Sequence, residues 1–174
     1  MGRVNAPTAE IAIDTIIESY HLFELRESIV RRVWRRARPN PYRRVAHELY
    51  VAIVGHARQP EFFAGLSVPD SVDGRFDMIS LHVFLVLRRL RNVGDNGDEF
   101  AQTLFDAFFA DMDRSLREMG VGDLGVGKKV RAMSKAFMGR VDAYDRALDA
   151  DSRQDLTDAL VRNLFRGNSP DQLV

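Results

Sequence analysis

The chain has 174 residues, enough for one domain that buries roughly 70% of the surface its unfolded form exposes. Lys plus Arg and Asp plus Glu each number 25, and the resulting net charge of zero excludes a global attraction to DNA or to an acidic partner. The absence of cysteine excludes disulfides, thiolate nucleophiles and cysteine metal sites.

Apolar residues recur at helical spacing from end to end, and no segment alternates with the period of two that is typical of a strand. The pattern predicts six helices, in chain order over 8–37, 41–58, 75–93, 99–119, from a glycine-rich bend at 120–127 to 148, and 152–167. The segment 59–74 should hold a short helical turn and a loop, and Ser152 with Asp155 resembles a capping box. We therefore expect an all-α, single-domain bundle of about six helices.

Three parts are expected along the chain: an N-terminal helix and basic segment at 1–40, loosely attached, a helical domain at 41–168, and a frayed tail at 169–174. The longest apolar run is far shorter than the roughly 20 residues that span a bilayer. The N-terminus carries acidic residues, unlike a secretory signal or a transit peptide. We expect the protein to remain in the compartment where it is made.

The basic segment interleaves cations with apolar side chains, and eight arginines stand against one glutamate between Arg26 and Arg44. A helix of this kind can lie in an anionic membrane interface with a tryptophan as anchor. The same cations can contact RNA phosphates, as on a ribosome, or simply form a solvated linker. The candidate contact residues are Arg31, Arg32, Trp34, Arg35, Arg36 and Arg38.

The glycine-rich bend contains Gly122, four further residues, Gly127 and Lys128, which is the spacing of a phosphate-binding loop. Lys129 stands where that motif needs a serine or threonine for magnesium, and the pattern follows a predicted helix instead of a strand. We interpret the bend as a tight joint between two helices, with Gly120 as a left-handed helix cap. A nucleotide-dependent switch is the weaker alternative.

No catalytic or metal-binding pattern emerges elsewhere. No two of the four histidines, at 21, 47, 56 and 82, lie three or four residues apart, and we expect His82 to be a hydrogen-bonded core residue. Carboxylates near the fourth helix are interpreted as a solvated face paired with Arg114 and Arg117. We expect a binding protein without catalytic residues, metal or cofactor, not an enzyme.

Three stretches, Gly74–Met78, Leu81–Arg91 and Leu104–Lys128, resemble the ubiquinol-cytochrome c chaperone family, within a similarity from about Ala46 to Leu164. The resemblance implies a helical assembly factor that helps to build ubiquinol-cytochrome c reductase. It would hold newly made cytochrome b until haem and partner subunits are added. It further implies a cytoplasmic protein, peripheral at the inner membrane, or one on the matrix side in an organelle.

A chaperone for an eight-helix membrane protein has to shield apolar helix surface, which a groove between amphipathic helices can do. We expect this client surface around the fourth helix, the bend and the start of the fifth helix, with Phe109 as its exposed apolar residue. The other candidates are Asp113, Arg114, Arg117, Glu118, Gly122, Asp123, Gly127 and Lys128. A helical regulator that binds RNA or another partner through the basic segment is the alternative.

Overall fold

The computed structural model describes residues 40–93 and 95–166. The chain divides into two compact units, Met1–Pro41 and Tyr42–Val174, and the description below concerns the second. Every regular element among these residues is helical, which confirms the predicted all-α fold. The elements are α2 (Arg43–Ala57), the π-helix η1 (Glu61–Gly65), α3 (Val72–Leu90), the 3₁₀-helix η2 (Arg91–Val93), α4 (Asp95–Glu118), α5 (Asp123–Asp149) and α6 (Arg153–Leu164).

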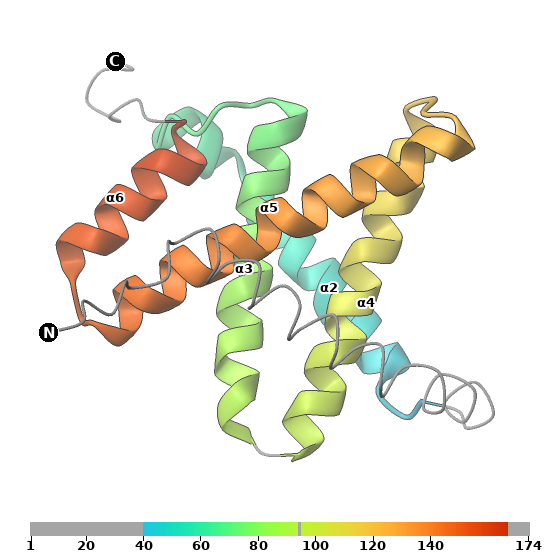
Figure 1. Ribbon diagram of the computed structural model, residues 1–174, viewed down its shortest axis with the longest axis horizontal. Helices are drawn as coiled ribbons and strands as arrows, with labels where there is room; N and C mark the ends of the chain where they lie inside the picture. The colour runs from blue at the N-terminus through green and yellow to red at the C-terminus, as the bar shows by residue number, and fades with distance from the viewer. Residues whose placement is uncertain (1–39, 94, 167–174) are drawn as a thin grey trace, which may run out of the picture. The chain divides into compact units, whose positions relative to one another are not determined.

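The five α-helices pack around one another without a layered arrangement (Figure 1). α2 lies against α3 and α4, and α4 leads to a turn from which α5 returns across α3. α6 then folds back along α5 and also touches α3. None of the helices described is both long and apolar enough to cross a bilayer.

Glycines set where two of the helices begin. The Ser71 side chain caps α3 by accepting a hydrogen bond from the Gly74 backbone N–H at 3.1 Å, so this helix starts earlier than predicted. A Cβ at Gly74 would lie 2.0 Å from the Pro69 carbonyl oxygen. At Gly97 a Cβ would lie 2.4 Å from the Leu90 carbonyl oxygen, so only glycine lets α4 start so close to the end of α3. The predicted start of the fourth helix at residue 99 is therefore wrong, because α4 already begins at Asp95.

Aromatic side chains fill the centre of the fold. Phe108 is completely buried on α4, and its ring contacts those of Phe76, Phe109 and Phe137 with centroid separations of 4.8–6.0 Å. A second cluster joins α3, α5 and α6 through Phe84, Tyr144 and Ala159. Buried Phe137 and Tyr144, together with part-buried Met133, Val141 and Leu148, form an apolar row along α5.

One ion pair lies inside this core. Asp77 on α3 is 1% exposed and accepts a hydrogen bond from Arg140 on α5 at 2.5 Å. The pKa of Asp77 is raised because burial disfavours its charged form more strongly than Arg140 favours it. The Arg140 guanidinium also lies 5.6 Å from the centre of the Phe76 ring. The Arg140 guanidinium therefore points into the domain, where its charge is paired with that of Asp77.

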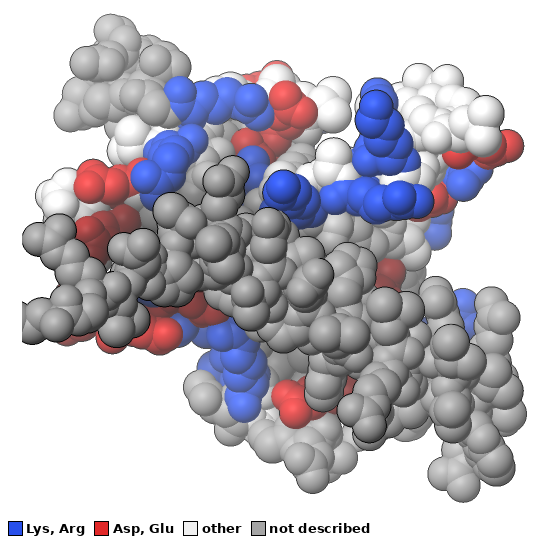
Figure 2. All heavy atoms as spheres, in the orientation of Figure 1, with Lys and Arg blue, Asp and Glu red and all other residues white. Residues whose placement is uncertain are grey.

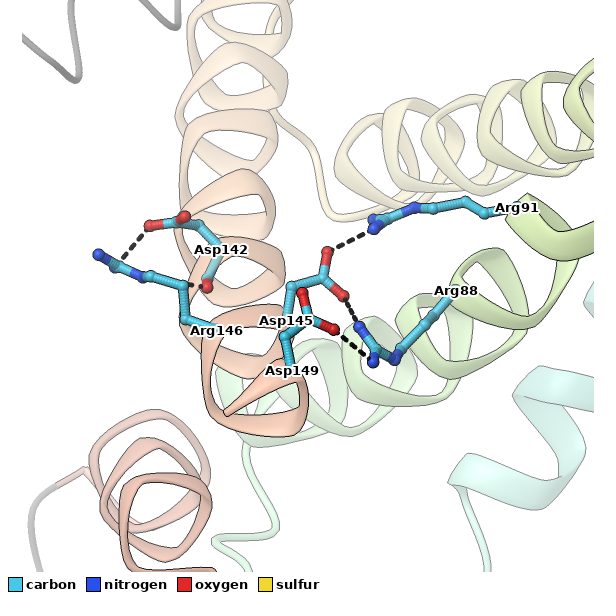
Figure 3. Close-up of polar contacts among 6 residues, drawn as sticks. All are labelled: Arg88, Arg91, Asp142, Asp145, Arg146 and Asp149. Carbon is cyan, nitrogen blue, oxygen red and sulfur yellow. Dashed lines mark hydrogen bonds and ion pairs between the residues drawn. The ribbon is translucent and has the colours of Figure 1, made fainter. Parts of the chain in front are cut away.

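A second ionic contact, shown in Figure 3, joins the end of α3 to the end of α5. Arg88 donates to Asp145 and to Asp149, each at 2.7 Å, and Arg91 donates to the other oxygen of Asp145 at 2.7 Å. Within α5, Arg146 pairs with Asp142, one helical turn away. We call the first set, Arg88, Arg91, Asp145 and Asp149, the α3–α5 clasp.

Candidate binding surface at the turn between α4 and α5

The turn between α4 and α5 is built on a single left-handed residue. Gly120 has φ of +81°, a value that glycine adopts without steric cost. The Val121 N–H donates to the Leu116 carbonyl at 3.0 Å and the Gly120 N–H to the Arg117 carbonyl at 2.9 Å. These two bonds form the Schellman motif that ends many helices. The expected cap at Gly120 is thus confirmed.

The bend is shorter than predicted, because α5 begins at Asp123 and includes Gly125 and Gly127. The N–H groups of Gly125 and Val126 both donate to the Gly122 carbonyl, at 2.7 and 3.1 Å. A phosphate loop needs such groups free, and it needs a strand before it where this chain has α4. The spacing of Gly122, Gly127 and Lys128 resembles a phosphate-binding loop, but these residues form the start of α5 and not a nucleotide-binding site.

Arg117 fixes the geometry of the turn. Its guanidinium donates to Asp113 at 2.6 Å, one turn back on α4, and also bonds Asp123, the first residue of α5. Hydrogen bonds to Asp113 and, with a smaller effect, to Asp123 raise the pKa of Arg117 above its ordinary value. Three of the predicted site residues therefore form one ion-paired group that ties the two helices together across the bend.

The remaining charged candidates are exposed around this group. Arg114 and Glu118 lie on the outer side of the last turns of α4, and Lys128 lies on the second turn of α5. Lys128 borders a shallow hollow together with Asp123, Leu124, Gly127 and Arg131. The structure thus brings most of the predicted charged residues to one end of the α4–α5 pair.

Phe109, predicted to be the exposed apolar residue of this surface, is part-buried. Phe109 packs against the core, where its ring contacts those of Phe105, Phe108 and Phe137. The exposed apolar side chains at the turn are instead Leu124, which is 100% exposed, and Met119, which is 53% exposed. In the sequence, Leu124 lies between Gly122 and Gly125 in the glycine-rich motif. An apolar residue at such a bend could have been predicted to be exposed. The surface therefore combines two exposed apolar side chains, the ion-paired group around Arg117, and the exposed charges of Arg114, Glu118 and Lys128.

The histidines show a contact that their spacing does not reveal. The rings of His56 and His82 have centroids 5.1 Å apart, and both contact Phe62. Nδ1 of His82 donates to the Met78 carbonyl oxygen at 2.8 Å, which confirms the predicted hydrogen bond, but the ring is part-buried and lies at the edge of the core. Across the described residues no three potential metal-ligating side chains come together. The membrane or ribosome residues Arg31 to Arg38 lie outside the described part of the chain.

The fold is an all-helical domain in which the turn between α4 and α5 carries exposed apolar and charged side chains. The model of the family described as ubiquinol-cytochrome C chaperone matches residues 64–173, a stretch that includes the whole α4–α5 pair. The chain belongs to this family.

Relatives and one solved structure agree with the family. The ubiquinol-cytochrome-c reductase complex assembly factor 1 of Xenopus laevis is 27% identical over 126 residues, which cover 72% of this chain and 62% of that protein. The human protein of the same name is 26% identical over 126 residues, which cover 72% of this chain and 42% of that protein. The crystal structure of the Cbp3 homolog from Brucella abortus has a TM-score of 0.66 and 39% identity, covering 81% of this chain and 77% of that chain.

Proposed function

We propose that this protein is an assembly chaperone for ubiquinol-cytochrome c reductase and that its client is newly made cytochrome b. The family match carries the proposal, because it spans the α4–α5 pair and because the relatives it resembles are named as assembly factors of this complex. The protein would act where cytochrome b is made, in the cytoplasm at the inner membrane of a bacterium or on the matrix side in an organelle.

The turn between α4 and α5 is the proposed client surface. Met119 and Leu124 offer apolar contact to a helix or connecting loop of the client, without a closed pocket that would demand one sequence. Arg117 and its two carboxylates hold this end of the helix pair in one conformation, which lowers the entropy lost on binding. Lys128, with Arg114 and Glu118, supplies charge at the rim.

Photocrosslinking in living cells tests this surface. A photoreactive residue at Met119 or at Leu124 should recover cytochrome b, because both side chains are exposed at the turn. The same residue at Arg153, which is exposed on α6, is the matched control and should recover much less. Equal recovery from the α6 position, or no cytochrome b from either turn position, would overturn the assignment.

Charge reversal supplies a second test. The variant Arg117→Glu with Lys128→Glu should lower cytochrome b capture at least about tenfold, since it removes the cation that holds the turn and one at its rim. Circular dichroism and a thermal melt show whether the variant is folded. A folded variant that captures cytochrome b as well as the unchanged protein would refute a role for these charges.

A further inference from the structure

One face of the N-terminal half of α5 carries cations between apolar ends. Residues at spacings of four and three share a helix face. This spacing places five exposed side chains in one row, which we call the α5 stripe: Leu124, Lys128, Arg131, Lys135 and Met138. The space-filling view shows Lys and Arg side chains gathered along the visible face of α5 (Figure 2). The opposite face of the helix is buried through Val126 and Phe137.

The cations of the α5 stripe differ from those in the second half of the same helix. Arg140 and Arg146 pair with Asp77 and Asp142. By contrast, Lys128, Arg131 and Lys135 make no ion pair with any residue in 40–93 or 95–166. Neighbours three and four residues apart on a helix repel when they carry like charge, so this row does not stabilise α5. An anionic partner would remove that repulsion.

The order of side chains along the row favours a lipid surface over a protein. The centre of a protein interface is depleted of charge and surrounded by a polar rim. The α5 stripe has the reverse order, with three cations in the middle and Leu124 and Met138 at the ends, of which Leu124 is fully exposed. Exposed apolar side chains beside lysine and arginine are typical of segments that lie in a membrane interface. The stripe also lacks an aromatic side chain on which RNA bases could stack.

We propose that the α5 stripe docks on an anionic lipid surface. Lys128, Arg131 and Lys135 contact lipid phosphates, while Leu124 and the neighbouring Met119 enter the headgroup region. This contact goes beyond client binding and does not involve the basic segment at Arg31–Arg38. It shares Met119, Leu124 and Lys128 with the proposed client surface, so lipid and client would occupy the turn at different times. It would hold the turn between α4 and α5 at the membrane surface.

Vesicle sedimentation with the full chain tests the proposal. The protein should bind phosphatidylcholine vesicles containing about a third phosphatidylglycerol, and should not bind pure phosphatidylcholine, because the attraction depends on anionic headgroups. The variant Arg131→Glu with Lys135→Glu should lower binding at least about tenfold, and Leu124→Asp should lower it as well. Neither variant alters a buried side chain, so both should remain folded.

The matched control is Arg153→Glu with Arg162→Glu on α6, the same change of charge at two exposed positions, and it should bind like the unchanged protein. Undiminished vesicle binding by Arg131→Glu with Lys135→Glu would overturn the proposal, as would loss of binding only in Arg35→Glu with Arg36→Glu. Binding to single-stranded RNA without binding to anionic vesicles would also overturn it. The assay contains no cytochrome b, so its outcome is independent of the client assignment.

Discussion

His82 shows how burial alters a single residue. Its ring lies half-buried beside Phe62 and His56, and its Nδ1 donates to the Met78 carbonyl oxygen. Burial lowers the pKa of His82 below 6.5, the hydrogen bond to Met78 partly opposes this, and the charge of His56 lowers it further. The folded state therefore keeps His82 neutral down to a lower pH than the unfolded chain, which protonates it near pH 6.5.

This difference predicts a pH dependence of stability. As pH falls below 6.5, the unfolded state takes up a proton that the folded state does not, so the free energy of unfolding decreases. In His82→Gln the fall in melting temperature between pH 7 and pH 5 should be shallower than in the unchanged protein. His47→Gln, at an exposed position on α2, is the control and should keep the original slope. Identical slopes for the two variants would contradict the role given to His82.

Sequence periodicity predicted the helices but misplaced residues at the edge of a buried face. Phe109 follows Phe108 directly and was assigned to the outer face of its helix. It is nevertheless part-buried against the core, because α4 packs against both α2 and α5 and its buried face is wider than a single neighbouring helix would make it. Met119 follows the same periodic row as Leu116, yet it lies beyond the last turn of α4 and is exposed. How many helices pack around α4 depends on the tertiary fold, and the spacing of apolar residues in the sequence does not reveal it.

At the scale of elements, the glycines of α5 and its neighbouring turn have opposite effects. Gly120 is required by its positive φ, while Gly139 lies in an exposed position inside α5 where a Cβ would meet no atom within 4 Å. Glycine inside a helix destabilises it relative to alanine. Gly120 therefore stabilises the turn between α4 and α5, whereas Gly139 destabilises α5.

The two positions predict opposite outcomes for the same substitution. Gly120→Ala should lower the free energy of unfolding by about 1 kcal/mol, because a Cβ is strained in the left-handed region. Gly139→Ala should raise it by about 0.5–1 kcal/mol through better helix propensity. Urea unfolding measures both. A loss of stability in Gly139→Ala, or none in Gly120→Ala, would contradict this account.

The sequence predicted the existence of these elements better than their ends. The capping pair at Ser152 was visible from spacing and is confirmed, since the Ser152 hydroxyl accepts from the Asp155 N–H at 3.1 Å. The start of α5 was placed too late because three glycines close together resemble a loop. Gly125 and Gly127 are tolerated in that helix because its opposite face packs through buried Val126. Tertiary packing outweighed local propensity there.

At the scale of the molecule, the α3–α5 clasp joins helices that are far apart in the chain. Arg88 bonds carboxylates 57 and 61 residues further along, whereas Arg146 bonds one only four residues away. Asp145, which receives both Arg88 and Arg91, is 16% exposed and would be left with one partner if Arg88 were removed. The clasp therefore constrains how α5 crosses α3.

The clasp predicts an order of thermal stabilities. Arg88→Ala should lower the melting temperature by a few degrees, and Arg88→Ala with Arg91→Ala should lower it more, because Asp145 then loses both cations. Arg146→Ala, which breaks only a pair within one helix, should change it little. Differential scanning calorimetry at low and high salt separates these effects. Equal melting temperatures for the Arg88 and Arg146 variants would contradict a role for the clasp.

The turn between α4 and α5 is also stabilised locally. Leu116 and Val126 are buried on either side of it but belong to neither of the two core clusters. Met119 and Leu124, which face outward from this turn, can therefore be exchanged without disturbing the residues that hold the domain together. Under the proposed function, substitutions at these two positions would therefore alter client recognition at almost constant folding stability. Replacing residues 119–124 by those of a relative would then transfer the client preference of that relative.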